Sequence, residues 1–290
     1  MGETCKNWTE WLSKTRFASL TEEQKIQTLN WLQLVGDIII NSAKIEENDT
    51  VIDIGTGTGL LAFKALEKLN GTGCVIFSDM FQDCLNSCQA FINANFKNIT
   101  GQYRMLLSPA DKLDLPNESV DKAVMRSVLV HIVDKQSAIT EICRVLKKGG
   151  RFSFFEPVIS SNTRYWELVR PENIKNYEAF KEAENSFMTD REDSLCNFDE
   201  NTIAANLDAA GFADGEINLD NVESKYIVSA PMIDEWFNNP PAPGRPTIKD
   251  RFLRYFSLED VNEYIKDLKR DLTGREITVR TKSIFAYAVK

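Results

Sequence analysis

The sequence of 290 residues contains one histidine, no C-x-x-C pair and no long apolar run. Six scattered cysteines with His131 as the only imidazole do not make a zinc site, so we expect no metal. Scattered thiols are typical of a reducing compartment. No stretch approaches the roughly 18 apolar residues of a membrane span, and no signal-peptide pattern opens the chain. These absences predict a soluble, cytoplasmic protein.

Positive charge is also scarce. The formal net charge of −9 would repel a polyanion, and no basic stripe offsets it. We therefore expect neither nucleic acid nor a membrane as a partner. The hydrophobic share of 43% and the charged share of 27% are those of an ordinary globular protein.

Strand and helix signals alternate along the chain, which is typical of a parallel sheet. The prediction is a doubly wound α/β fold with a mostly parallel, seven-stranded, Rossmann-like sheet. Predicted strands lie at 51–54, 74–79, 104–108, 121–127, 151–157, near 215–229 and at 277–290, and predicted helices near 59–69, 81–95 and 134–146. Gly149 and Gly211 are expected to end helices, because glycine adopts the left-handed conformation without a steric penalty.

Three parts are expected. Residues 1–43 form an N-terminal helical cap, in which Thr21 and Gln24 fit a capping box. A central α/β domain spans 44–230 and 273–290, with a polar, largely helical stretch at 161–191. A helical insertion at 231–272, which includes a stiff proline-rich turn, is expected to form a separate cap.

The most informative segment is VIDIGTGTGLLAFKAL, where a buried strand runs into a glycine-rich loop and then a helix. Such a loop lets a ligand lie against the main chain at the carboxyl end of a parallel strand. A dinucleotide fingerprint requires a small residue where this chain has Leu60, and no P-loop is present. The segment instead fits a D-x-G-x-G-x-G arrangement. Two alternative interpretations are that the glycines form an incidental turn, or that the protein is a nicotinamide-dependent oxidoreductase.

At these residues the chain resembles the class I S-adenosylmethionine-dependent methyltransferases, and the resemblance covers roughly residues 45–160. It implies S-adenosylmethionine as cofactor and S-adenosylhomocysteine as product, with Asp53 at the ammonium end and the glycines at the sugar and methionyl parts. Asp79 would accept hydrogen bonds from the ribose hydroxyls, or it would simply cap a helix. The implied cofactor-binding residues are Asp53, Gly55, Thr56, Gly57, Gly59, Asp79, Met80, Ala110, Asp111, Lys112, Arg126 and Ser127.

A later block, from SPADKLDLP to RVLKKGGRF, is similar to the family's adenine-binding and fourth-strand region. By this resemblance Asp111 lies beside the adenine amino group, while Arg126 and Ser127 lead toward the methionyl end. Ala110 and Lys112 contribute backbone; the family often has alanine where this chain has Lys112.

Methyl transfer from a sulfonium needs alignment of the acceptor and exclusion of water rather than a metal. Two residues at strand ends are candidate catalytic groups. His131 is either a base near neutral pH or a packing residue. Glu156 either orients the acceptor or caps a strand end.

The domain at 44–230 and 273–290 would be the catalytic domain. Acceptor recognition is expected from variable segments: the N-terminal helices around Arg16 and Phe17, the 161–191 segment and the insertion at 231–272. The candidates are Arg164, Trp166 and Arg245, of which Arg245 would clamp a carboxylate or else form surface ion pairs. The expected function is O-methylation of a small molecule or of a peptide carboxylate. N-, S- or metalloid methylation, the last suggested by Cys84 and Cys88, and a non-enzymatic cofactor-binding scaffold remain alternatives.

Overall fold

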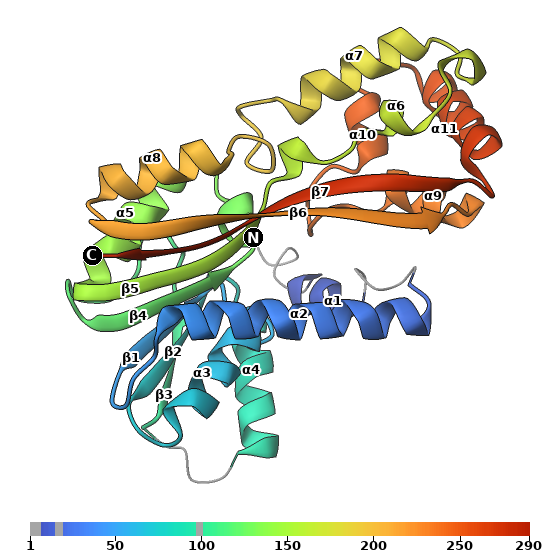
Figure 1. The fold of residues 1–290 in the computed structure, drawn as a ribbon. Helices are drawn as coiled ribbons and strands as arrows, with labels where there is room; N and C mark the ends of the chain where they lie inside the picture. Colours follow the sequence, from blue (N-terminus) through green and yellow to red (C-terminus); the bar gives the residue numbers. More distant parts are fainter. Residues whose placement is uncertain (1–6, 15–19, 97–100) are drawn as a thin grey trace. The chain divides into compact units, whose positions relative to one another are not determined.

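The computed structural model describes residues 7–14, 20–96 and 101–290 (Figure 1). Its sheet has seven strands in the order β3-β2-β1-β4-β5-β7-β6; β1 to β5 are parallel, and β7 runs antiparallel to β5. The doubly wound, mostly parallel fold predicted from the sequence is therefore confirmed. The strands are β1 (Thr50–Ile54), β2 (Cys74–Asp79), β3 (Tyr103–Leu107), β4 (Val120–Arg126), β5 (Leu146–Pro157), β6 (Asp214–Ile227) and β7 (Glu276–Val289).

The helices that border these strands follow the predicted alternation. They are α1 (Asn7–Ser13), α2 (Glu22–Ala43), α3 (Leu60–Leu69), α4 (Gln82–Asn95), α5 (Lys135–Val145), α6 (Tyr165–Leu168), α7 (Tyr177–Met188), α8 (Glu200–Ala210), α9 (Ala230–Asn238), α10 (Ile248–Phe252) and α11 (Leu258–Leu272). Short 3₁₀ turns lie at η2 (Leu129–His131), η3 (Ile159–Ser161) and η4 (Pro171–Asn173). The capping box predicted for α2 is present, since Thr21 and Gln24 each bond the other's backbone N–H.

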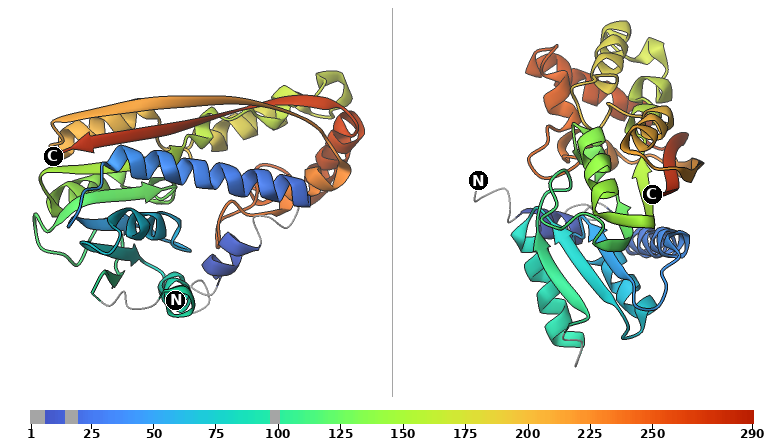
Figure 2. Two further views of the ribbon diagram at one scale, coloured as in Figure 1. Left: turned by 60° about the horizontal axis from the view of Figure 1, so that its bottom comes forward. Right: turned by 90° about the vertical axis from the view of Figure 1, so that its left-hand side faces the viewer.

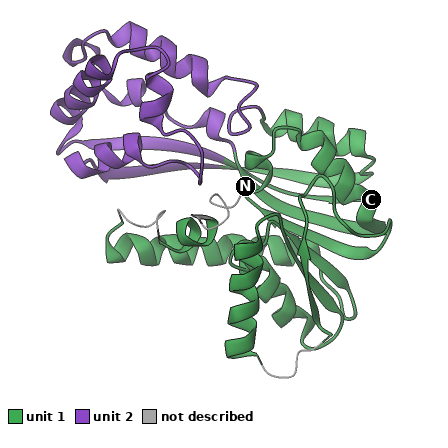
Figure 3. Ribbon diagram, turned by 180° about the vertical axis from the view of Figure 1, so that it is seen from behind, with its two compact units in different colours: residues 1–157, 198–220, 283–290 green, residues 158–197, 221–282 purple. Residues whose placement is uncertain are grey.

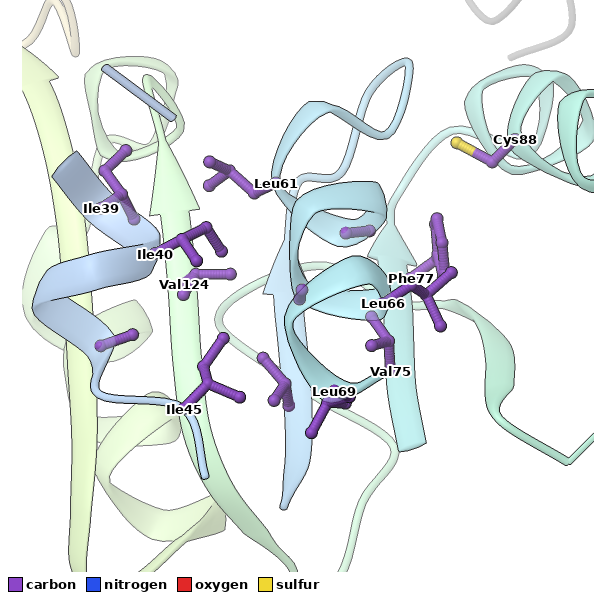
Figure 4. Close-up of a cluster of buried hydrophobic side chains, with 14 of the residues drawn as sticks. Ile39, Ile40, Ile45, Leu61, Leu66, Leu69, Val75, Phe77, Cys88 and Val124 are labelled. Carbon is purple, nitrogen blue, oxygen red and sulfur yellow. The ribbon is translucent and has the colours of Figure 1, made fainter. Parts of the chain in front are cut away.

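Both faces of the sheet are covered. Helices α2, α3 and α4 share one apolar core with the strands, in which Ile39, Phe77 and Val124 take part (Figure 4). Side chains of β5 alternate between the faces: Phe155 packs on Trp31 of α2 with ring centroids 5.6 Å apart, while Phe152 packs on Phe212 after α8. This burial on both faces explains why the strands read as continuous apolar runs in the sequence.

The chain divides into two compact units (Figure 3). Unit 1 comprises 1–157, 198–220 and 283–290, and unit 2 comprises 158–197 and 221–282. This division differs from the expected one, which assigned 158–197 to the catalytic domain and isolated 231–272.

The physical reason for the difference lies in long strands and in packing between distant segments. Strands β6 and β7 run side by side and contribute to both units (Figure 2). Within unit 2, Phe180 of α7 stacks on Tyr264 of α11 with centroids 4.0 Å apart, and it also contacts Phe252 of α10. The helical stretch around 161–191 and the insertion therefore share one core.

One glycine prediction is confirmed and the other is wrong. Gly211 follows α8 in the left-handed conformation, with φ of 92°. Helix α5, by contrast, ends at Val145, and β5 already begins at Leu146. Gly149 has φ of 76° inside that strand, where the pairing register with β4 shifts, so it supports an irregularity in the strand rather than a helix end.

Candidate functional site

The glycine-rich loop lies between β1 and α3 and is shaped by three left-handed glycines. Gly55, Gly57 and Gly59 have φ of 66°, 54° and 89°. A Cβ at Gly55 would lie 2.4 Å from a methyl carbon of Val128, and one at Gly59 would lie 2.4 Å from the Phe63 ring. Both the conformation and the space therefore require glycine. The loop forms a close backbone turn at the carboxyl end of a central strand, where α/β folds bind ligands.

Asp53 braces this loop from inside. Its Oδ2 accepts hydrogen bonds from the Thr56 hydroxyl at 2.7 Å and from the Ala62 N–H at 3.0 Å. The side chain is 2% exposed, and burial raises the pKa of Asp53 to about 7. This geometry favours a role in holding the loop, rather than the direct contact with the cofactor ammonium that the resemblance implied.

Asp79, at the end of β2, ties the loop to the next strand. Its Oδ2 accepts the Gly57 N–H at 2.9 Å, and its Oδ1 accepts the Phe81 N–H at 3.0 Å. Burial raises the pKa of Asp79. The neighbouring Met80 is 59% exposed. The structure thus has an acidic group beside the loop, and its role in binding the ribose stays a prediction.

The predicted adenine-binding turn follows β3. The Ser108 N–H donates to the Asp79 carbonyl at 2.9 Å, and its hydroxyl donates to the Lys112 carbonyl at 2.6 Å, so the turn is fixed to the end of β2. Ala110 is half-buried, whereas Asp111 and Lys112 are exposed. The structure therefore brings this turn and the acidic strand end together.

Residues at and just after the end of β4 contribute a further part of the candidate site. Ser127 has a left-handed backbone with φ of 55°, which is unusual for a residue other than glycine and is a common form of strain at functional sites. Arg126 precedes it; burial lowers the pKa of Arg126, although the carboxyl groups of Asp53 and Glu156 act in the opposite direction. His131 ends the η2 turn and is half-buried.

Glu156 holds this turn. Its Oε1 accepts the N–H groups of Val128 and Leu129 at 2.7 and 2.8 Å, and its Oε2 accepts that of Val130 at 3.0 Å. The side chain is fully buried, and burial raises the pKa of Glu156 to about 7. A carboxylate occupied by three amides is a cap for the turn that carries His131. The geometry gives no support to the catalytic role considered for Glu156.

Helix α1 supplies side chains that the sequence analysis did not assign to the site. Trp8 lies edge-on to His131 and beside Phe81, with ring centroids 5.3 and 5.4 Å apart. Leu12 lies over the loop, 3.0 Å from the position of a Cβ at Gly57. The shared apolar face of Trp8 and Leu12 is visible in the sequence, but the surface that it covers is not.

Comparison with known proteins identifies the family. A family model described as "Methyltransferase domain" matches residues 45–207, which is more than half of the chain and includes every element of the site except α1. The chain belongs to the class I S-adenosylmethionine-dependent methyltransferases. S-adenosylmethionine is accordingly its cofactor.

Curated relatives of this methyltransferase domain are similar over part of their length. A ubiquinone/menaquinone biosynthesis C-methyltransferase, UbiE, of Francisella tularensis subsp. novicida is 30% identical over 123 residues, which are 41% of this chain and 48% of that protein. The UbiE of Xanthomonas oryzae pv. oryzae is 26% identical over 142 residues, or 49% of this chain and 53% of that protein. The chain thus spans about half the length of these relatives.

Solved structures share the fold. The YcgJ protein of Bacillus subtilis has a TM-score of 0.57 at 19% identity, covering 89% of this chain and 98% of the other. A geranyl diphosphate C-methyltransferase of Streptomyces coelicolor has a TM-score of 0.52 at 13% identity, covering 92% and 83%. A Haemonchus contortus phosphoethanolamine N-methyltransferase has a TM-score of 0.51 at 17% identity, covering 94% and 58%.

The acceptor-binding residues expected in this methyltransferase lie in unit 2, and all three have partners there. The Arg164 guanidinium donates to the carbonyls of Asn162 and Ser160 at 2.8 and 2.6 Å. Arg245 donates to Asp193 at 3.5 Å and to the Ser194 hydroxyl. These arginines stabilise turns of their own unit, so the structure does not support a carboxylate clamp. The Trp166 indole N–H donates to the Asn185 side chain at 3.1 Å.

Two further expectations concern metals and thiols. Within the described residues, no group of three or more His, Cys, Asp or Glu side chains could hold a metal ion. Cys84 and Cys88 are buried on α4, where burial raises the pKa of both thiols, that of Cys88 to about 12. Such thiols are mostly protonated at neutral pH and poor nucleophiles, which disfavours metalloid chemistry.

The Cys88 thiol instead donates to the Gly57 carbonyl at 3.4 Å and so supports the glycine loop. Across the described part of the chain, no helix is both long and apolar enough to cross a membrane. Arg16 and Phe17, which were expected near the acceptor, lie outside the described residues.

Proposed function

We propose that this chain transfers the methyl group of S-adenosylmethionine to a small-molecule acceptor that carries an ionisable hydroxyl group, and that oxygen is the atom methylated. The observation that carries the proposal is the position of His131. This sole histidine of the chain ends the η2 turn after β4, and the Glu156 carboxylate caps that turn. Val128, three residues before His131, lies against Gly55 of the cofactor loop. A half-buried imidazole there is suited to take a proton from an acceptor.

Binding of the cofactor would use the backbone of Gly55, Gly57 and Gly59, with Asp79 facing the ribose hydroxyls. The turn at 110–112 would lie at the adenine, and Arg126 and Ser127 at the methionyl end. The loop fits this use because its glycines allow a close backbone turn, and because Asp53 holds Thr56 of the loop by a hydrogen bond.

The backbone of Gly55, Gly57 and Gly59 would hold the cofactor, which would supply a sulfonium-bound methyl group for transfer to the acceptor oxygen. His131 would take the hydroxyl proton as the oxygen becomes a better nucleophile. Trp8, which packs edge-on against His131 and is itself packed on Phe81, would exclude water from the reacting atoms. The chain's contribution is thus alignment and one proton transfer.

A second candidate is methylation at carbon of the same kind of acceptor, favoured by the similarity to ubiquinone/menaquinone C-methyltransferases. Deprotonation of a hydroxylated ring also activates the carbon beside the hydroxyl, so His131 would serve in the same way. The peptide-carboxylate alternative loses support, because Arg164 and Arg245 are already bound to groups of their own unit.

The test is a methyl-transfer assay with labelled cofactor and mass spectrometry of the products. The acceptors compared are hydroxylated aromatic compounds, their methyl ethers and a peptide carboxylate. Each acceptor is assayed with the wild-type protein and with His131→Gln. We expect transfer only to compounds with a free hydroxyl, and a kcat about 10²-fold lower in the variant. Equal transfer to the ethers, or transfer only to the peptide, contradicts the proposal. Cofactor binding without transfer to any compound would favour the scaffold alternative.

A further inference from the structure

The Asp83 carboxylate connects helix α1 to α4, beside a side-chain hydrogen bond between Thr9 and Cys84 of α4. The Oδ2 of Asp83, in the first turn of α4, accepts hydrogen bonds from the backbone N–H of Thr9 at 3.1 Å and from the Thr9 hydroxyl at 2.9 Å. Hydrogen bonds to an ionised acceptor are stronger than those between neutral groups. Asp83 therefore fixes α1 at a defined place beside the end of β2.

This attachment matters because α1 is short. A helix of seven residues is not stable by itself, so its position depends on its tertiary contacts. When Thr9 is held by Asp83, the side chains one residue before and three residues after it reach the site. Trp8 then packs against Phe81 and His131, and Leu12 lies over Gly57.

A second observation concerns the other oxygen of the same carboxylate. Asp83 Oδ1 is buried and has no hydrogen-bond partner among the described residues. A buried carboxylate oxygen without a partner costs stability, and such groups in native structures call for an explanation. An apolar residue would avoid this cost, and we relate the presence of Asp83 to the two hydrogen bonds that its Oδ2 accepts.

We propose that Asp83 is a positioning residue of the methyltransferase, which retains the cofactor by fixing α1 over the glycine loop. The proposal rests on the cofactor-binding role proposed for that loop. A ligand held against the loop and Asp79 is released once Leu12 and Trp8 move away, and they move when Thr9 separates from Asp83. The strength of this contact therefore sets the rate at which product leaves and fresh cofactor enters.

Thr9→Val tests this inference, because it removes the hydroxyl bond and keeps the branched side chain. Thr9→Ser keeps the hydroxyl and serves as the conservative rescue. The matched control is Ser13→Ala, which removes an exposed hydroxyl whose hydrogen bond among the described residues is to the Thr9 carbonyl, within α1. Asp83→Ala removes the acceptor of both bonds.

The measurement is the release of labelled S-adenosylhomocysteine from the full chain after a chase with unlabelled ligand. We expect release about tenfold faster in Thr9→Val, faster still in Asp83→Ala, and close to the wild-type rate in Thr9→Ser and Ser13→Ala. The KM for S-adenosylmethionine should rise more than kcat falls. Thermal melting shows whether each variant is folded.

The possible failures are distinguishable. If the wild type does not bind S-adenosylhomocysteine, the proposed function is contradicted. If the wild type binds but Thr9→Val releases the ligand at the wild-type rate, the inference about Asp83 is overturned. Equal acceleration by Ser13→Ala would also overturn it, because general weakening of α1 would then explain the effect.

Discussion

The role of Glu156 is best tested by replacement with glutamine, which keeps the shape of the side chain and converts one acceptor oxygen into a donor. Three N–H groups, of Val128, Leu129 and Val130, point at the carboxylate over 2.7 to 3.0 Å. In Glu156→Gln at least one of these buried amides loses its acceptor, at a cost of about 2 kcal/mol. For a chain of this size that corresponds to a Tm lowered by roughly 5 °C.

Differential scanning calorimetry measures this effect, and methyl-transfer kinetics are recorded on the same samples. Glu118→Gln, at an exposed residue whose partner Lys290 is 3.7 Å away, is the control and should change the Tm by less than about 1 °C. A Glu156→Gln protein with an unchanged Tm and abolished transfer would refute the reasoning, because Glu156 would then be catalytic rather than a cap.

Three further predictions concern Asp53, Asp79 and Arg245. Burial raises the folded-state pKa of Asp53 to about 7 from 3.8. The contribution of Asp53 to stability is therefore full below about pH 4 and is lost as the pH rises to about 7. Asp53→Asn should show a smaller change in unfolding free energy between pH 5 and 8 than wild type, and an equal change would count against this. Asp79→Asn should weaken S-adenosylhomocysteine binding by about tenfold in calorimetry, and unchanged affinity would exclude Asp79 from the site. Arg245→Ala should lower the Tm without changing the KM for the acceptor; a raised KM at constant Tm would restore the carboxylate clamp.

The sheet and the cofactor loop could be predicted from the sequence because their signals are local. Apolar runs mark the strands, and the glycines of the loop are required by backbone conformation and by close contacts such as that between Gly55 and Val128. The turn after β3 and Asp79 follow from the resemblance, and the structure brings both to the same edge of the sheet.

What the sequence did not reveal depends on contacts between distant residues. Glu156 lies 26 to 28 residues along the chain from the amides whose hydrogen bonds it accepts, and Asp83 lies 74 residues from Thr9. Gly149 is a residue type that often ends a helix, yet pairing between β4 and β5 places it inside a strand. Arg245 was identified as a candidate by its position on a rigid turn, but its partner Asp193 is 52 residues away.

The central claim is that the glycine loop binds the nucleoside cofactor, and calorimetric titration of the full chain with S-adenosylhomocysteine tests it most directly. Gly55→Ala forces a left-handed alanine with its Cβ against Val128, whereas Gly211→Ala imposes the same conformation in open space far along the chain. The account predicts binding at one site in wild type and in Gly211→Ala, and affinity lower by about tenfold or more in Gly55→Ala. No binding to the wild type, or equal affinity in the two variants, would contradict it.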